Sequence, residues 1–547
     1  MRKSICLIFS ISALLVSCSS NKPTLVYGEP VFGTVTEECP VATTVYGKVS
    51  GVNRDGVAIF RGIPYGGCVS GQNRWKPALV PDSWDGVREC TVNGPFCPQG
   101  MGEASISANP SELGMTFNGG HPELFGCENE KPDENCLVLN VLTPGVDQSK
   151  RPVMVYFHGG GFTTGTGSLV LGADKLCREE DLVVVGVNHR LNVFGYLYLG
   201  HKDPEYSASG SVGIQDLVLS LEWVRDNISA FGGDPDNVTI IGESGGGFKI
   251  CNLMAMPSAS GLFHHAIVES GSNPVGGLGV DKAAEYTDRL LATLGLSDGD
   301  SWKELFNLDA ETIHDAFSRS HIPLSPVADG NVLPYYESGT WTPELSKDIP
   351  VLVGSSADEF GVFLPIDKFA EDMTWETVKD RAVTQFHVPA DKAAEAVEAF
   401  RTRNDKNDDP WHVYLKMHST STLLGVGAYH QAFRRSKAGF APVYNYLVEF
   451  DSESVFNPSL RCAWHTADLP LQMRVVYHEE CEGLSKTMAH AWAAFCRTGS
   501  PSTPELEWPA FTPENPQVMV FDKEVKVMSD PDASLRQYIE TDWDSEG

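Results

Sequence analysis

The stretch Asn237-Val238-Thr239-Ile240-Ile241-Gly242-Glu243-Ser244-Gly245-Gly246 joins an apolar, β-branched run to a turn rich in glycine. The run predicts a buried strand, and the residues after the turn predict a helix. Ser244 therefore lies where a strand turns sharply, with small neighbours that leave its hydroxyl accessible. This arrangement is typical of a nucleophile elbow. A chain with 52 glycines also meets Gly-x-Ser-x-Gly by accident, so the pentapeptide needs support from the rest of the sequence.

A second glycine motif lies upstream in the chain. Residues 151–157 read as another buried strand, and they run directly into His158-Gly159-Gly160-Gly161-Phe162. A glycine loop of this kind has bare backbone N–H groups that can point at an oxyanion. Two such motifs in this order are much less frequent by chance than one. Together they predict a site for nucleophilic acyl chemistry.

Short apolar runs alternate with helical patterns along most of the chain. The predicted strands are residues 153–157, 182–187, 238–241, 266–268, 351–353, 442–448 and 518–521. Residues 213–228 carry apolar side chains at helical spacing. This alternation predicts an α/β fold with a mostly parallel sheet covered by helices on both faces. Active sites of such sheets lie at the carboxyl ends of strands, where Ser244 and the glycine loop both fall.

Residues 367–439 differ from this pattern, because they read as mostly helical with few strand signals. We interpret them as an insertion that helps to form the substrate cavity, or alternatively as ordinary helices covering the sheet.

Composition limits the classes of function. The 547 residues are 42% hydrophobic, which permits a large core, and length alone allows one large domain with insertions or several smaller ones. The formal net charge is −31 and the chain has no Lys/Arg-rich run, which argues against a nucleic-acid partner. The acidic surface favours solubility, or alternatively it concentrates cationic ligands.

The first residues predict export. Met1-Arg2-Lys3 and the apolar residues 5–16 form a short secretory signal, and Leu15-Val16-Ser17-Cys18 resembles a bacterial lipobox. That resemblance implies a mature chain that begins at Cys18, where acyl chains anchor it to a membrane of the cell envelope. The alternative is an ordinary signal peptide with an incidental Cys18. We therefore expect a signal over residues 1–17, a tether over 18–44 and a single catalytic domain over 45–547.

An acyl-transfer serine also needs a base and an acid. In sheets of this kind they follow the nucleophile in the order acid, then histidine. Asp358 and Glu359 lie in the loop after the strand 351–353, and either could orient an imidazole. Among 15 histidines, His465 is best placed, shortly after the strand 442–448.

These motifs belong to a longer ordered set. The matching runs are residues 60–65, 135–141, 158–162, 188–190, 194–195, 231–235, 242–246, 269–272, 326–330, 358–359 and 508–509. With them the chain resembles type-B carboxylesterases and cholinesterases of the α/β-hydrolase fold, over roughly residues 45 to 520. The resemblance implies an ester hydrolase that forms an acyl-enzyme and needs no metal or organic cofactor.

The resemblance also implies a role for each site residue. Ser244 corresponds to the nucleophile, His465 to the general base and acid, and Glu359 to the carboxylate that holds His465. The implied donors of the oxyanion hole are the backbone N–H groups of Gly160, Gly161 and Gly245. Ser270 corresponds to a supporting serine beside the acid and the histidine, or alternatively to a buried serine bonded to backbone. His158 is interpreted as structural, and Asp358 as solvated or structural.

Within this family the sequence narrows the substrate only a little. Cholinesterases hold choline against a tryptophan, and residues 98–135 contain none, which disfavours a choline esterase. A broad carboxylesterase for small, partly apolar esters is preferred. The alternatives are a lipase or sterol-ester hydrolase and, from another class, a binding protein that has lost the chemistry. All three triad positions are filled, which argues against the last. The oligomeric state is not indicated.

Export would make disulfides possible among the 13 cysteines. The family resemblance implies a Cys97–Cys136 bridge, while Cys68 with Cys90 and Cys462 with Cys481 are weaker candidates. Cys251 is interpreted as a buried small apolar residue.

Overall fold

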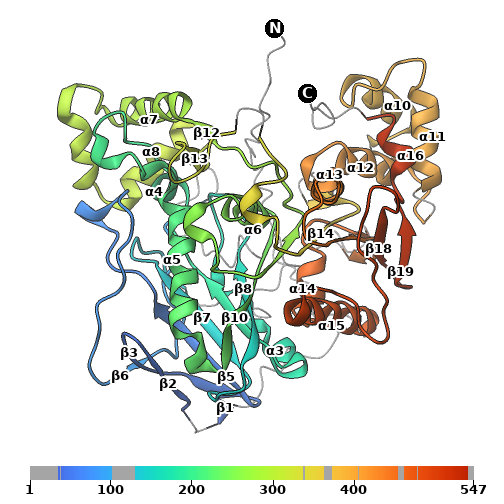
Figure 1. Cartoon of the computed structure of the whole chain (residues 1–547). Helices are drawn as coiled ribbons and strands as arrows, with labels where there is room; N and C mark the ends of the chain where they lie inside the picture. The colour runs from blue at the N-terminus through green and yellow to red at the C-terminus, as the bar shows by residue number, and fades with distance from the viewer. Residues whose placement is uncertain are drawn as a thin grey trace.

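The chain folds around one large central sheet (Figure 1). The structure, a computed structural model, describes residues 35–36, 39–100, 130–336, 339–362, 372–403, 406–453, 461–476 and 479–539. In spatial order the twelve strands are β1 (Val35–Thr36), β4 (Val52–Arg54), β5 (Val57–Pro64), β7 (Val138–Thr143), β9 (Val183–Val187), β8 (Arg151–Phe157), β10 (Gly233–Glu243), β11 (His265–Glu269), β14 (Val351–Ser356), β15 (Val443–Val448), β18 (Gln517–Phe521) and β19 (Lys526–Ser529). Cys18, the residue expected to carry the lipid anchor, lies outside the described residues.

The centre of the sheet is parallel and its edges are antiparallel. Strands β9, β8, β10, β11, β14, β15 and β18 run in the same direction, and all seven were predicted from their apolar runs. The antiparallel strands β1, β4, β5, β7 and β19 were not predicted. Three small sheets are separate: β2 (Val41–Thr44) with β3 (Gly47–Ser50) and β6 (Val87–Glu89), β12 (Leu278–Gly279) with β13 (Val327–Ala328), and β16 (Ser452–Glu453) with β17 (Arg461–Cys462).

Side chains of the central strands alternate between two hydrophobic cores, one on each face of the sheet. In β8, Val153 and Val155 belong to one core, and Met154 and Tyr156 belong to the other. The first core includes residues of helices α5 and α6, and the second includes residues of α3 and α15. A strand buried on both faces has to be apolar at every position, which is why these strands are continuous apolar runs.

The helices cover both faces and extend beyond the sheet. They are α3 (Asp174–Glu180), α4 (Asn192–Tyr196), α5 (Val212–Asn227), α6 (Gly245–Leu253), α7 (Val280–Leu294), α8 (Ala310–Ser320), α10 (Trp375–Thr384), α11 (Ala393–Arg403), α12 (Pro410–Thr420), α13 (Leu423–Lys437), α14 (Asp468–Gln472), α15 (Glu482–Thr498) and α16 (Ala533–Arg536). Helices α10 to α13 confirm the helical character expected for residues 367–439. In Figure 1, α7 and α8 lie at the upper left and α10 and α11 at the upper right.

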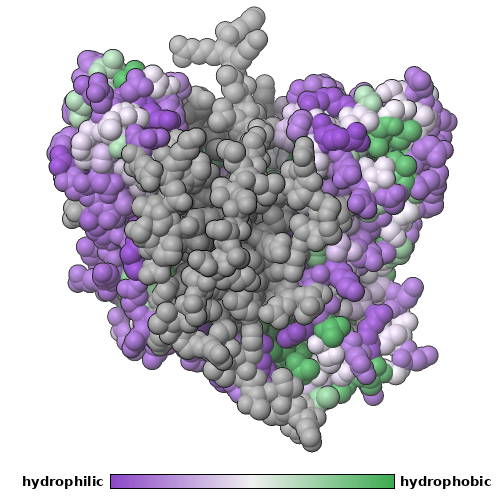
Figure 2. All heavy atoms as spheres, turned by 180° about the vertical axis from the view of Figure 1, so that it is seen from behind, coloured by the Kyte–Doolittle hydropathy of each residue, from purple (hydrophilic) through white to green (hydrophobic). Residues whose placement is uncertain are grey.

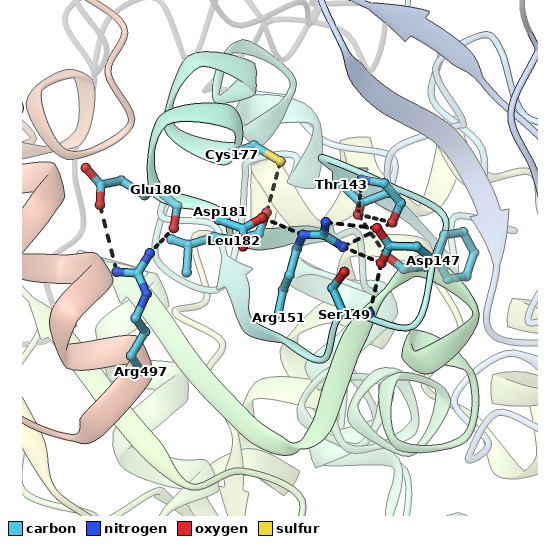
Figure 3. Close-up of polar contacts among 11 residues, drawn as sticks. Thr143, Asp147, Ser149, Arg151, Cys177, Glu180, Asp181, Leu182 and Arg497 are labelled. Carbon is cyan, nitrogen blue, oxygen red and sulfur yellow. Dashed lines mark hydrogen bonds and ion pairs between the residues drawn. The ribbon is translucent and has the colours of Figure 1, made fainter.

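The amino end of β8 is held by exposed ion pairs, at the opposite end of the strand from the glycine loop (Figure 3). The Arg151 guanidinium contacts Asp147 at 2.7 Å and Asp181 at 2.5 Å. The Arg151 side chain lowers the pKa of Asp147 through these hydrogen bonds. Both carboxylates are largely exposed, so each pair contributes little to stability, about 1 kcal/mol or less.

The described part of the surface in Figure 2 is mostly hydrophilic, as expected for a chain with a net charge of −31. Within the described residues, no helix is both long and apolar enough to cross a membrane.

Candidate active site

The register of the sheet brings distant residues to one edge. Gly242 of β10 pairs with Phe157 of β8, and Glu243 pairs with Glu269 of β11. These strands are parallel, so the residues that follow them, His158, Ser244 and Ser270, emerge from the same edge of the sheet. The predicted location of the site at the carboxyl ends of the strands matches this geometry.

Ser244 occupies a sharp turn between β10 and α6. Its backbone angles are φ 55° and ψ −121°, a conformation that costs a residue with a side chain about 1–3 kcal/mol. The turn is held from both sides, because the Ser244 N–H donates to the Glu269 carbonyl at 2.8 Å and the Ser244 carbonyl accepts from Phe248 N at 3.1 Å. The surrounding structure thus maintains a strained serine at the point where the sequence predicts an elbow.

The glycine loop packs backbone to backbone against this turn. A Cβ atom on Gly245 would lie 2.3 Å from the backbone N of Gly161, and one on Gly246 would lie 2.1 Å from the Phe157 carbonyl oxygen. No side chain fits at either position. Gly160 and Gly161 both have positive φ, 79° and 63°. The loop and the elbow can approach this closely only because the residues on both sides of the contact are glycines, which have no side chain.

Glu359 and His465 form a buried pair. Glu359 begins a short 3-10 helix, Glu359–Val362, directly after β14, and His465 follows β17. The Nδ1 atom of His465 is hydrogen-bonded to Glu359 Oε2, and both side chains are completely buried. The other carboxylate oxygen, Oε1, accepts from Ser270 Oγ and from the Ser356 N–H, each at 2.7 Å. Ser270 therefore contacts the carboxylate as the resemblance implied.

The neighbouring Asp358 has a different position. Its Oδ2 accepts from the Ala463 N–H at 3.1 Å, and its own N–H donates to the Ala463 carbonyl at 2.9 Å. Burial raises the pKa of Asp358 to about 6. Asp358 is buried and structural, because it fixes the segment that leads to His465, and the solvated alternative is wrong.

Three further buried carboxylates, those of Glu243, Glu269 and Asp468, lie near the Glu359–His465 pair and interact with one another, and no sequence motif marks them as a group. Oε1 of Glu243 lies 3.1 Å from Nε2 of His465. Burial raises the pKa of Glu243 well above its usual range, and the charges of Asp468, Glu359 and Glu269 add to that shift. Glu269 accepts from Gln472 Nε2 at 2.7 Å and from Trp492 Nε1 at 2.8 Å. Asp468 accepts from the Tyr446 hydroxyl at 2.7 Å, and burial raises its pKa to about 6.

A buried lysine lies on the other side of the elbow. Lys249 of α6 is completely buried, and its Nζ donates to the His158 carbonyl at 2.8 Å. His158 stacks on His189 with ring centroids 4.6 Å apart, and burial holds the pKa of both imidazoles well below 6.5. His158 is therefore a neutral structural residue, as expected. Lys249 could not be found from the sequence, because a lysine in a helix is normally exposed and the residues around it show nothing unusual.

All ten cysteines in the described part of the chain are free thiols, so the Cys97–Cys136 bridge is absent from the structure. The two thiols lie in contact in the core, where burial and the Cys97 thiol raise the pKa of Cys136 well above 9. With its pKa raised in this way, the Cys136 thiol stays protonated at neutral pH. Cys68–Cys90 and Cys462–Cys481 are not bridged either. Cys251 is buried, as predicted.

A small, partly open cavity lies next to the segment that leads from β14 to Glu359. Ser355 and Ser356 line it from β14, together with residues of α12, α13 and the segment around Asp532. Helices of the 367–439 segment thus line a cavity next to the site. Neither Ser244 nor His465 lines it, so a role for these helices in substrate binding stays a prediction. The described residues contain no cluster of His, Cys, Asp or Glu side chains that could hold a metal ion.

A mostly parallel sheet with helices on both faces, a strained serine turn and a buried carboxylate–imidazole pair at the same edge define an α/β-hydrolase. The family model described as "Carboxylesterase family" matches residues 38–538. The chain belongs to this family, and it is a carboxylic ester hydrolase.

Similar proteins agree with that assignment. Para-nitrobenzyl esterase of Bacillus subtilis is 32% identical over 517 residues, which cover 91% of this chain and 98% of the relative. Phenmedipham hydrolase of Pseudarthrobacter oxydans is 31% identical, with 89% and 95% of the two chains covered. A solved structure of a Geobacillus stearothermophilus carboxylesterase superposes with a TM-score of 0.75 at 31% identity, covering 91% of this chain and all of the other.

Proposed function

We propose that this protein hydrolyses carboxylic esters with Ser244 as nucleophile, His465 as general base and acid, and Glu359 as the carboxylate that orients His465. The observation that carries the proposal is the convergence at one edge of the sheet. There the Glu359–His465 pair lies beside Glu243, the residue directly before Ser244, at 3.1 Å. The strained conformation of Ser244 supports the same role, because strain of this kind gathers at active sites.

In the first step, Ser244 Oγ forms a bond to the ester carbonyl carbon while His465 Nε2 takes the hydroxyl proton. The carbonyl electron pair moves to oxygen, where the N–H groups of Gly160, Gly161 and Gly245 stabilise the negative charge. The intermediate collapses, the C–O bond to the alcohol breaks, and His465 returns its proton to the leaving alcohol. Water then attacks the acyl-enzyme by the same route and releases the acid.

Glu359 stabilises the imidazolium that forms in each step. Its Oε2 holds Nδ1–H, so that Nε2 keeps a free lone pair toward the nucleophile. Ser270 and the Ser356 N–H fix the carboxylate in turn. In comparable sites, one oxyanion donor is worth about 3–4 kcal/mol of activation free energy.

The preferred substrates are small, water-soluble esters with partly apolar acyl and alcohol groups. The names of two relatives, para-nitrobenzyl esterase and phenmedipham hydrolase, are the reason for choosing aromatic test esters. A lipase would instead favour emulsified long-chain esters, so comparing p-nitrophenyl acetate with an emulsified long-chain triacylglycerol separates these alternatives.

The mechanism is tested by turnover of p-nitrophenyl acetate by wild type and Ser244→Ala. Loss of the nucleophile in a triad lowers kcat by about 10⁶-fold. The matched control is Ser260→Ala, since Ser260 is an exposed serine outside the site. A fluorophosphonate probe should label wild type and Ser260→Ala at Ser244, and it should not label Ser244→Ala. Equal turnover by wild type and Ser244→Ala would refute the mechanism and favour a protein without serine chemistry.

For location, we infer from the lipobox pattern that the exported chain is anchored through lipid on Cys18 in the bacterial cell envelope.

A further inference from the structure

We propose that Lys249 is a positioning residue for ester hydrolysis, which fixes the glycine loop through the His158 carbonyl and whose charge favours the carboxylate form of Glu243 beside His465. This inference rests on the proposed function, because it assigns a role in the Ser244 mechanism to a residue that does not contact the reacting atoms.

Lys249 lies between the nucleophile turn and the glycine loop. Lys249 lies in α6, little more than one helical turn after Ser244, and its Nζ reaches across to the His158 carbonyl at 2.8 Å. His158 immediately precedes the three loop glycines. One side chain therefore connects the helix that follows the nucleophile to the start of the loop that carries the oxyanion donors.

That connection matters because the glycine loop and the serine turn are tightly packed against each other. Gly161 and Gly245 are in backbone contact, and a Cβ atom on Gly159 would lie 3.0 Å from Glu243 Oε2. A small shift of the loop would move the N–H groups of Gly160 and Gly161 relative to the oxyanion. Misplacement by about 1 Å in an active site can lower the rate about 100-fold.

The charge of Lys249 also acts on the groups around it. The titratable groups that face Lys249 are His158, His189 and Glu243. Both histidines are neutral, since burial and the lysine charge hold their pKa values well below 6.5. Burial also lowers the pKa of Lys249 to about 7, while the charge of Glu243 opposes that shift. Lys249 therefore carries its positive charge below about pH 7, and Glu243 is the group whose charge favours that protonated form.

Glu243 is the carboxylate on which this charge acts. Burial raises the pKa of Glu243 most and the charges of Asp468, Glu359 and Glu269 raise it further, whereas the charge of Lys249 opposes the shift and favours the carboxylate. Oε1 of Glu243 lies 3.1 Å from Nε2 of His465. A protonated Glu243 could donate its proton to Nε2 and occupy the nitrogen that must accept the Ser244 proton. An ionised Glu243 leaves that lone pair available and stabilises the imidazolium.

The test compares Lys249→Met, Lys249→Arg and the control Lys416→Met by kcat, KM and the pH profile of kcat/KM with p-nitrophenyl acetate. Lys416 of α12 is also buried, and its Nζ pairs with Asp532 of the C-terminal segment at 3.4 Å. Removing it tests the loss of a buried lysine in general. Circular dichroism and thermal melting establish that each variant is folded.

We expect Lys249→Met to lower kcat about 10- to 100-fold with KM changed less than about 3-fold, because the affected donors act in the transition state. The ascending limb of its kcat/KM profile should move to higher pH by about one unit or more, since Glu243 then has to lose its proton without help. Lys249→Arg keeps a positive charge and should keep the limb at its wild-type pH. Lys416→Met should leave both kcat and the limb unchanged.

A folded Lys249→Met with kcat within 2-fold of wild type and an unmoved limb would overturn the inference. Should this variant not fold, Lys249→Gln, which keeps a donor but no charge, takes its place: a moved limb supports the role of the charge and an unmoved one refutes it. Ser244→Ala is measured in parallel. If Ser244→Ala retains turnover, the proposed function is refuted. If Ser244→Ala loses turnover and Lys249→Met keeps wild-type turnover, only the role of Lys249 is refuted.

Discussion

Replacing Glu359 by glutamine tests the carboxylate that contacts His465. An ionised carboxylate accepts hydrogen bonds at both oxygens, and here it accepts from His465 Nδ1, Ser270 Oγ and Ser356 N. Glutamine offers one oxygen and one NH₂ group. If the oxygen remains toward Ser270 and Ser356, the NH₂ group faces His465 and forces the imidazole to carry its proton on Nε2. The base then points an N–H at Ser244 instead of a lone pair.

The reverse orientation places the NH₂ group against the Ser356 N–H, two donors in a fully buried space. Leaving one buried donor unsatisfied costs about 1–3 kcal/mol, so we expect the first orientation. The wrong tautomer in a triad of this kind lowers kcat about 10⁴-fold, which corresponds to about 5.5 kcal/mol in activation free energy. KM should change little, because Glu359 does not contact the substrate.

The assay is the initial rate of p-nitrophenyl acetate hydrolysis at neutral pH for Glu359→Gln, with Asp358→Asn as the adjacent control. Asparagine keeps an oxygen that can accept the Ala463 N–H, so Asp358→Asn should retain activity within about 3-fold. The assignment would be wrong if Glu359→Gln kept a rate within tenfold of wild type while a folded Asp358→Asn was inactive.

Three further outcomes are expected. Gly245→Ala should lower kcat at least about 100-fold, because its Cβ would lie 2.3 Å from the Gly161 backbone, whereas Gly483→Ala, with open space around it, should be neutral in the same assay. The folded pKa of Lys249, about 7, lies below its unfolded value of about 10.4, so the cost of burying its charge is complete below pH 7 and declines as pH rises toward 10. Thermal melts should therefore show Lys249→Met losing stability relative to wild type with rising pH, by at most about 1.4 kcal/mol per pH unit, and a difference independent of pH would contradict this. Intact protein should partition with membranes and Cys18→Ala should not; a wild type found wholly in the aqueous fraction would exclude the lipid anchor.

The central strands could be predicted from the sequence because burial on both faces requires apolar residues throughout. The antiparallel strands at the edge of the sheet could not be predicted in this way. Strand β5 contains Gly62 and Pro64, and its register with β7 shifts between Phe60 and Ile63, so its pattern is interrupted. The strand β1 has only two residues, too few for any periodicity. The domain boundary at residue 45 stays a prediction, as does the tether before it.

The sequence by itself predicted the elbow at Ser244, the glycine loop and the parallel strands whose carboxyl ends carry them, because steric demands on turns and buried strands are local and leave a pattern in the chain. The family resemblance favoured Glu359 over the adjacent and equally acidic Asp358, but only the tertiary structure shows their contacts: Glu359 is hydrogen-bonded to His465, and Asp358 accepts from the Ala463 N–H. The tertiary structure alone also revealed Lys249, Glu269 and Asp468 as buried charged or titratable groups around the site. Desolvation and charge coupling depend on neighbours that are distant in the chain, and such neighbours are fixed only when the elements pack.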